Sequence, residues 1–120
     1  MKKILIAVKN KNDQTLLTHY IKKYFVCETL TVTNGEDALR LAIDYNPDVI
    51  IAEAGLKVYD ELNLIEYLNT SFSTPVIAIT GVNDNKFVNK LFSLGIISYI
   101  AKPINSYKLY ENIESLFTAA

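Results

Sequence analysis

Cysteine, histidine and tryptophan are almost missing from this chain of 120 residues, which contains one cysteine, one histidine and no tryptophan. The single cysteine, Cys27, excludes an internal disulfide bond and is typical of a reducing compartment. It lies in a β-rich stretch of alternating residues, which favours a packed side chain over a reactive thiol. A fold that depends on disulfide bonds is therefore not expected.

Long hydrophobic runs and an excess of one charge are missing as well. No apolar run approaches the ~20 residues that a membrane-spanning helix needs, and the apolar stretch 4–8 is too short for a signal peptide. The formal net charge is −1 and the lysines are scattered, whereas nucleic-acid binding needs a concentrated basic face. We expect a cytoplasmic protein that binds neither membranes nor nucleic acids directly.

The residues that are present are those of an ordinary globular domain. Half of them are apolar and 21% are charged, and the length suits a single domain over residues 1–120. Short apolar runs predict strands, several of them buried on both faces of a sheet. These runs are residues 4–8, 27–33, 49–53, 75–79 and 97–101.

Apolar residues at helical spacing predict a helix after every strand. The third helix is expected over residues 61–68, and Gly95 is the glycine expected just after the fourth. The expected helix starts or caps are Asn12 or Asp13, Asn34, Asn83 or Asp84, and Asn105 or Ser106. The expected inward-facing residues are Leu16, Leu17, Tyr20, Ile21 and Tyr24, then Ala38, Leu39, Ala42 and Ile43, then Leu62, Leu64, Ile65 and Leu68, and finally Leu109, Ile113 and Leu116.

Strands that alternate with helices predict a parallel sheet between two layers of helices. In such sheets the connections are right-handed, and ligands bind at the carboxyl ends of the strands. The residues just after each strand are therefore the candidate site residues. They are Val8, Lys9 and Asn10, then Glu53, then Thr80 and Gly81, and then Lys102 and Pro103.

Four segments resemble the receiver domain of bacterial response regulators, and the likeness covers the whole chain. They are residues 34–39 (NGEDAL), 47–53 (PDVIIAE), 74–81 (TPVIAITG) and 95–103 (GIISYIAKP). Each is weak alone, but four in order at the family's spacing are a strong signal. The resemblance implies a flavodoxin-like α/β fold, a doubly wound parallel sheet of five strands with five helices and strand order 2-1-3-4-5. It also implies a module of two-component phosphorelay signalling.

The first and third strands depart from the family pattern. Family members end the first strand with an acidic pair and the third with a phosphoacceptor Asp, but this chain has Val8, Lys9 and Glu53 there. Moving the nearest acid, Asp13, back to the strand would displace the apolar face of the first helix. With Lys102 the pocket carries a formal charge of +1, whereas Mg2+ prefers carboxylate oxygens. We therefore expect no metal, no cofactor and no phosphorylation of the usual Mg2+-dependent kind.

Two interpretations of Glu53 stay open. In the first, its longer carboxylate imitates a phosphoryl group and accepts from the Thr80 hydroxyl and Lys102, while Lys9 replaces the missing cation. In the second, Glu53 is a paired carboxylate that fills a relic pocket. A phosphate carries about −1.5 to −2 charges and three acceptor oxygens, which a glutamate does not match, and this favours the second interpretation.

The resemblance also implies roles outside the phosphorylation position. Thr80 and Tyr99 are the expected switch residues, and Lys102–Pro103 is a candidate cis peptide that would aim the lysine into the pocket. The fourth helix, fifth strand and fifth helix are expected to bind a partner, since aromatic residues are enriched at interfaces. The candidates are Phe87, Lys90, Leu91, Tyr99, Tyr107 and Tyr110. The expected partners are a histidine kinase, an output domain, a downstream protein or a second copy of the chain.

Two alternative functions remain, and a third finds no support. One is a conventional receiver that is still phosphorylated at Glu53. The other is a flavodoxin-type small-molecule domain, although the loop after the first strand, residues 9–13, has no glycine for a phosphate loop. No nucleophile and base pair supports a hydrolase, so we expect no enzyme. Because receivers usually precede an output domain, we expect either a stand-alone module or a domain of a longer protein.

Overall fold

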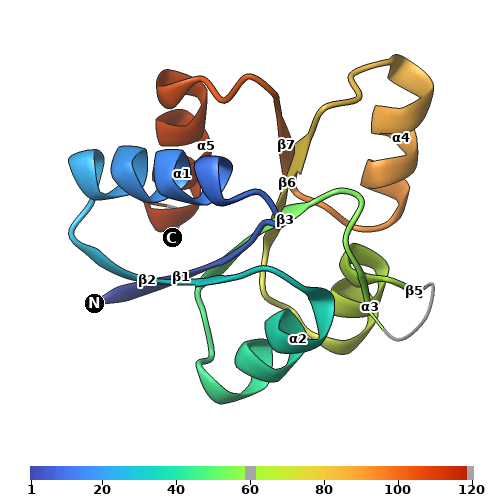
Figure 1. The fold of residues 1–120 in the computed structure, drawn as a ribbon, viewed down its shortest axis with the longest axis horizontal. Coiled ribbons are helices and arrows are strands. Elements are labelled where there is room, and N and C mark those ends of the chain that lie inside the picture. The colour runs from blue at the N-terminus through green and yellow to red at the C-terminus, as the bar shows by residue number, and fades with distance from the viewer. Residues whose placement is uncertain (59–61, 119–120) are drawn as a thin grey trace.

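The chain folds around a parallel sheet of five strands (Figure 1). The computed structural model describes residues 1–58 and 62–118. The strands are β1 (Lys2–Ala7), β2 (Cys27–Val32), β3 (Val49–Glu53), β6 (Val76–Thr80) and β7 (Ser98–Ala101), in the order β2-β1-β3-β6-β7. All neighbouring pairs are parallel. This confirms the predicted order 2-1-3-4-5, because the labels β4 and β5 belong to a separate short hairpin.

Helices follow the strands as the spacing predicts. They are α1 (Lys11–Tyr24), α2 (Gly35–Asp44), α3 (Leu64–Ser71), α4 (Asn85–Ser93) and α5 (Ser106–Thr118). Asn34, Asp84 and Asn105 accept backbone N–H bonds at the starts of α2, α4 and α5, as expected of caps. The prediction for α1 is wrong. Asn10 takes the cap position instead, because its backbone is still extended after β1 and its side chain accepts from the Asp13 N–H at 3.0 Å.

The segment after β3 differs most from the prediction. A short antiparallel hairpin forms there from β4 (Lys57–Val58) and β5 (Leu62–Asn63). Leu62 is therefore in a strand, and α3 starts only at Leu64, where the Asn63 side chain accepts from the Ile65 N–H at 2.9 Å. Residue 61, where the helix was expected to begin, lies outside the described residues.

Two apolar layers enclose the sheet, one on each face, because successive side chains of a strand point to opposite sides. Alternate strand residues such as Ile4 and Ile6 pack with α1 and α5, whereas Leu5 and Ala7 pack with α2, α3 and α4. Figure 1 shows α1 and α5 on one side of the sheet and α2 and α3 on the other. Ile43 is a correction, since it is 64% exposed and lies outside the buried face of α2.

Gly95 follows α4 with a φ of 104°, which confirms it as the glycine that ends this helix. None of the helices that the structure describes combines the length and hydropathy needed to cross a membrane.

Candidate functional site

The predicted site residues meet at one edge of the sheet, where the parallel strands end. Val8 directly follows β1 and is fully buried, and Thr80 ends β6 and is buried as well. Glu53 ends β3 and is half-buried, while Lys9 is exposed. Lys102 comes directly after β7, and its backbone N–H donates to the Thr80 carbonyl at 2.8 Å. The chain thus brings the five pocket positions together at the edge where α/β folds bind ligands.

Glu53 is held by the backbone of the first strand end. Its Oε1 accepts the Lys9 N–H at 3.0 Å. The Lys9 ammonium forms no ion pair within residues 1–58 and 62–118. Lys9 therefore engages Glu53 through its main chain, and its side chain does not serve there as the substitute cation of the phosphate-like interpretation.

Thr80 does not donate to Glu53, so the contact expected for a phosphate-like Glu53 is not formed. The Thr80 hydroxyl donates to the Val82 carbonyl at 2.9 Å and accepts the Val82 N–H at 2.9 Å. A hydroxyl that makes both bonds within its own turn closes the loop after β6. The bond that the phosphate-like interpretation requires is not formed because the main chain two residues away offers a donor and an acceptor within reach.

Lys102 is paired with Asp13, an acid that the sequence interpretation left out of the pocket. Lys102 Nζ lies 2.8 Å from Asp13 Oδ2, and the two side chains are only 29% and 23% exposed. Asp13 lies in the first turn of α1, as predicted, and not at the end of β1. Its side chain nevertheless reaches across to the end of β7. Lys102 therefore forms an ion pair with Asp13 in place of the contact with Glu53 that the phosphate-like interpretation requires.

The ion pair changes the electrostatics of the pocket. The hydrogen bond from Lys102 to Asp13 raises the pKa of the Lys102 ammonium, and the charges of Glu53 and Asp13 add to the effect, while partial burial opposes it. Counting Asp13 with the other pocket residues lowers the formal charge from +1 to zero. The site is thus electrically balanced by its own side chains. The Lys102–Pro103 peptide bond is cis, as the sequence suggested.

The variant Asp13→Asn is expected to lower the pKa of Lys102 toward its ordinary value of 10.5. Because the folded-state pKa is raised, the pair adds stability that is complete below pH 10.5 and is lost as the pH rises through the raised pKa. For a pair that is partly exposed, the loss of stability at neutral pH is about 1 kcal/mol or less. An NMR titration of the lysine Cε signals measures the shift. An unchanged Lys102 titration in the variant would contradict the pairing.

Gln14 is a second residue of this region that sequence analysis missed. It is buried, and its amide nitrogen donates to the Val8 carbonyl at 2.6 Å and to the Val32 carbonyl at 3.2 Å. These bonds fasten the first turns of α1 to the ends of β1 and β2. The signal in the sequence was a polar residue at i−3 from the buried Leu17, on the face that packs against the sheet.

The predicted interface residues fall into three groups. Leu91 is a correction, because it is 2% exposed and belongs to the core, and Phe87 packs partly against that core. Tyr110 packs on the rings of Tyr24, the last residue of α1, and Phe25, which follows it, with ring centres 5.0 and 5.7 Å apart. The exposed Lys90 and Tyr107 and the half-buried Tyr99 reach the surface. The apolar side of α4 and one side of α5 are thus already covered by the domain itself.

Comparisons with known proteins point to one family. The family model of the response regulator receiver domain matches residues 4–114. Over 116 residues the chain is 27% identical to protein-glutamate methylesterase/protein-glutamine glutaminase 2 of Carboxydothermus hydrogenoformans, covering 91% of this chain and 32% of that protein. It is 28% identical to the transcriptional regulatory protein CrdR of Helicobacter pylori, covering 88% and 52%. The chain spans about a third to a half of the length of these curated relatives.

Solved structures agree on the fold. The signal receiver domain of the DNA-binding response regulator protein merR from Colwellia psychrerythraea 34H matches with a TM-score of 0.89 at 24% identity, covering 99% of this chain and 100% of that one. A response regulator from Desulfuromonas acetoxidans matches with a TM-score of 0.88 at 23% identity, covering 98% and 97%.

The fold, the strand-end residues and the comparisons agree with one another. Receiver domains interact with histidine kinases and output domains, and as a family they are generally not enzymes. The flavodoxin-type alternative is not favoured, because the family match covers nearly the whole chain. The chain belongs to the receiver-domain family of two-component response regulators.

Proposed function

We propose that this receiver works by binding a protein partner and that it does not accept a phosphoryl group at Glu53. The observation that carries the proposal is the pairing at the site. Lys102 is held by Asp13 at 2.8 Å, and Glu53 is held by the Lys9 N–H at 3.0 Å. The Lys102 ammonium and the Glu53 carboxylate, which would act on a phosphoryl group, are thus each engaged with another group of the pocket.

The residues at the site do not fit Mg2+. The ion needs an octahedron of oxygen ligands and is usually bound through one or two carboxylates together with phosphate oxygens. Val8 offers no side-chain oxygen, Lys9 carries a positive charge, and Asp13 is neutralised by Lys102. In the described parts of the chain, no three acidic, histidine or cysteine residues are grouped so that they could share a metal ion.

Glu53 is best interpreted as a paired carboxylate rather than as an imitation of phosphate. Its contact with the Lys9 N–H ties the end of β3 to the end of β1, and the Thr80 hydroxyl is occupied by Val82. A phosphate-like role would require the carboxylate to set the position of Thr80. If Glu53 does control the output surface, both Glu53→Asp and Glu53→Gln should change the affinity for a partner.

Incubation of the protein with acetyl phosphate and Mg2+ is expected to leave its intact mass unchanged. The physical reason is that phosphoryl transfer onto a carboxylate relies on a metal to neutralise the developing charge. In addition, Glu places the attacking oxygen about 1.5 Å from the position that Asp would give it, which spoils the in-line geometry. Mass spectrometry of the intact chain measures the outcome.

A receiver with the complete acidic pair, treated in parallel, is the positive control for this experiment. It should gain about 80 Da, the mass of one phosphoryl group. The same gain in this chain, lost again in Glu53→Gln, would overturn the proposal in favour of a conventional receiver.

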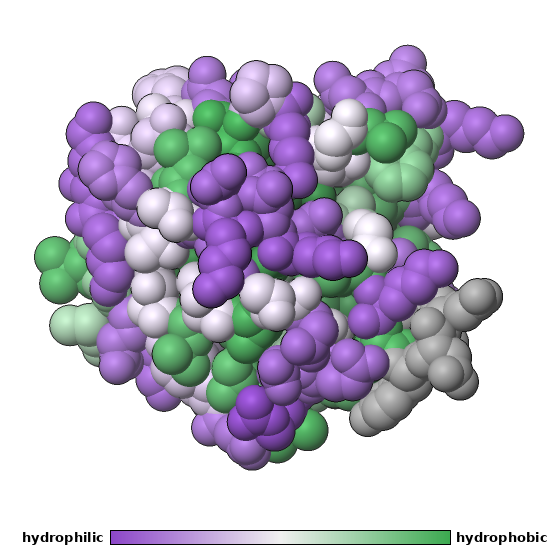
Figure 2. Space-filling view, viewed as in Figure 1, coloured by the Kyte–Doolittle hydropathy of each residue, from purple (hydrophilic) through white to green (hydrophobic). Residues whose placement is uncertain are grey.

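The partner is proposed to be a histidine kinase, an output domain or a downstream protein. The face seen in Figure 2 is largely hydrophilic, and its apolar residues form small separate patches. Large contiguous apolar patches mark protein or membrane interaction sites, so on this face a partner would rely on polar contacts. A homodimer through α4, β7 and α5 remains a prediction.

A further inference from the structure

Strand β2 is an open edge of the sheet and pairs only with β1. The Val8 N–H donates to the Val32 carbonyl at 3.1 Å, so the backbone groups of Val32 point toward β1. Because backbone groups alternate in direction along a strand, those of Leu30 also point toward β1. Those of Thr29 and Thr31 point away from the sheet. An unpaired row of this kind is a template for another strand.

The free backbone groups of β2 lie on either side of Leu30. At the start of the strand, the Cys27 carbonyl is occupied, because Lys22 Nζ donates to it at 2.7 Å. Among the residues that the structure describes, no hydrogen bond reaches the outward N–H and carbonyl groups of Thr29 or Thr31. Two residues of β2 therefore keep both backbone groups free, one on each side of Leu30.

Strand β2 lacks the features that usually protect a strand edge. Such edges are blunted by prolines, lysines, bulges, short length or a covering element. β2 has six residues without proline or lysine, and it pairs with β1 in an unbroken register. In Figure 1, α1 lies above the sheet at this edge and α2 lies below it. Leu30 is 38% exposed, so the middle of the strand is accessible.

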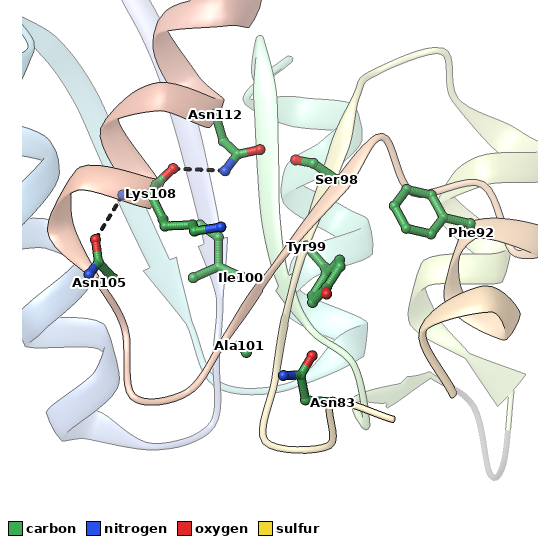
Figure 3. A pocket seen from close by; sticks show the side chains of 9 residues that line it. All are labelled: Asn83, Phe92, Ser98, Tyr99, Ile100, Ala101, Asn105, Lys108 and Asn112. Atoms are coloured by element: carbon green, nitrogen blue, oxygen red, sulfur yellow. Dashed lines mark hydrogen bonds between the residues drawn. The ribbon is translucent and has the colours of Figure 1, made fainter. Parts of the chain in front are cut away.

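The opposite edge strand, β7, is protected in two of these ways. It has only four residues. Lys108 lines the hollow of about 470 Å3 beside it, and Figure 3 shows this side chain extending from α5 toward β7. A strand that docked there would have to take water from the ammonium group, which is costly for a charge without a partner. Of the two edges, β2 is therefore the one open to pairing.

A second copy of the chain matches the β2 edge when the two strands run antiparallel about a two-fold axis at Leu30. In this register Thr29 of one copy lies opposite Thr31 of the other. Each such pair exchanges two backbone hydrogen bonds. The two symmetric pairs together use all the free backbone groups of both threonines. The edge is thus self-complementary, as a two-fold interface requires.

The side chains fit the same register. Leu30 lies on the same face of the sheet as Val32, which packs with the α2 layer. It would meet Leu30 of the second copy directly, with Cβ atoms about 4.5–5.5 Å apart. On the other face the opposed threonines can bond each other, and a hollow of about 350 Å3 between α1 and Thr31 gives them room.

Charge does not oppose this arrangement. Glu28 is the only charged residue of β2 and would lie opposite Val32 of the second copy. The two Glu28 residues are then four positions apart along the strands, or about 14 Å. This distance exceeds the Debye length of about 8 Å at physiological salt.

We propose that this protein forms a symmetric dimer in which β2 pairs antiparallel with β2 of a second copy and joins the two five-stranded sheets into one. The proposal goes beyond the proposed function and does not depend on it, because it uses no residue of the pocket. An unrelated partner finds one charge and one exposed apolar side chain to select for, whereas a second copy matches every feature by symmetry. The interface is small, so we expect a dissociation constant of about 100 µM.

Disulfide trapping tests the register. In Leu30→Cys the two new thiols lie directly opposite each other, within the Cα separation of about 4.4–6.8 Å that a disulfide allows. Mild oxidation with oxidised glutathione is therefore expected to give a covalent dimer on a non-reducing gel. Glu28→Cys, on the same face of the same strand, is the matched control and is expected to cross-link at least about tenfold more slowly, because its symmetry mate is about 14 Å away. Both variants keep the buried Cys27.

Sedimentation equilibrium of the natural chain measures the affinity. Leu30→Lys is expected to weaken dimerisation by about tenfold or more, because like charges directly opposite repel. Leu30 is exposed, so the substitution leaves the core intact. Ile97→Lys changes a residue that is 49% exposed just before β7, at the other edge, and should leave the dissociation constant unchanged.

Three outcomes overturn the proposal. The first is a natural chain that stays monomeric at about 1 mM. The second is a Glu28→Cys variant that cross-links as fast as Leu30→Cys. The third is a dimer that Ile97→Lys dissociates and Leu30→Lys does not, which would assign it to the face of α4, β7 and α5. Dimerisation is measured without acetyl phosphate, so this proposal and the proposed function can fail separately.

Discussion

The double variant Lys9→Asp/Glu53→Asp is expected to gain about 80 Da from acetyl phosphate in the presence of Mg2+, whereas the natural chain gains nothing. The change acts on two of the three pocket positions that depart from the family pattern, and these two lie next to each other. The Lys9 N–H is 3.0 Å from the Glu53 carboxylate. The side chain of an aspartate at position 9 would therefore branch from a backbone that already contacts the carboxylate at position 53.

Two effects combine in this variant. Replacing Lys9 removes a positive charge and adds an oxygen ligand, so that two carboxylates can hold Mg2+, the number that such sites commonly use. Shortening Glu53 by a methylene moves its attacking oxygen back by about 1.5 Å toward an in-line position. The metal then neutralises the charge that develops during transfer. Thr80 and Lys102 are already at the same edge of the sheet.

The single variants Lys9→Asp and Glu53→Asp are the matched controls, and each is expected to stay unmodified or to react far more slowly. Circular dichroism verifies that all three variants fold. If Glu53→Asp alone gains the mass, the missing carboxylate at position 9 is not what prevents phosphorylation of the natural chain. If the folded double variant gains nothing, the buried Val8, which offers no oxygen, limits the reaction instead.

The strand and helix pattern was predictable because the apolar runs of the sequence are the segments that the fold buries. The residues 4–8 and 75–79 are almost entirely within the core, so a run of apolar side chains had one physical explanation, a strand covered on both faces. The caps of α2, α4 and α5 were readable for a similar reason, since a short polar side chain before an amphipathic stretch satisfies the free N–H groups. These features depend on residues that are close together in the chain, so they can be predicted from the sequence.

The site was predictable only in part, because the direction of a long side chain depends on what lies across the fold. The positions of Glu53, Thr80 and Lys102 at one edge followed from parallel strands. That Lys102 would choose Asp13 over Glu53 did not follow, because the two acids are 40 residues apart in sequence and both come near the lysine. The Thr80 hydroxyl likewise found its partners in the main chain of Val82.

The β4–β5 hairpin was missed because its two-residue strands are too short to show a period. Tertiary packing holds it in place. Gly35, at the start of α2, lies so close to β4 that it leaves no room for a Cβ atom there. The segment that follows Glu53 is therefore positioned by a glycine in another element.

The variant Gly35→Ala is accordingly expected to destabilise the fold by about 1–3 kcal/mol, the usual cost of forcing atoms into a packed interior. An added Cβ would overlap the Lys57 carbonyl oxygen and lie 2.8 Å from its carbon and 3.1 Å from the Val58 Cβ. Helix propensity alone predicts the opposite sign, because alanine is favoured over glycine in a helix by about 1 kcal/mol. Backbone atoms cannot rotate away as a side chain can, so the steric term wins. Equilibrium urea unfolding measures the difference.

Gly55→Ala is the matched control, since apart from its own chain neighbours no atom lies within 4 Å of the Cβ that would be added there. Its stability is expected to stay unchanged or to rise by about 0.4–1 kcal/mol, because alanine restricts the unfolded chain. Equal stabilities of Gly35→Ala and the natural chain would mean that β4 moves away at little cost, and the hairpin would then have no part in holding the loop after Glu53. A loss confined to Gly35→Ala instead means that the close contact between the start of α2 and the Lys57 carbonyl of β4 helps to hold the segment that follows Glu53.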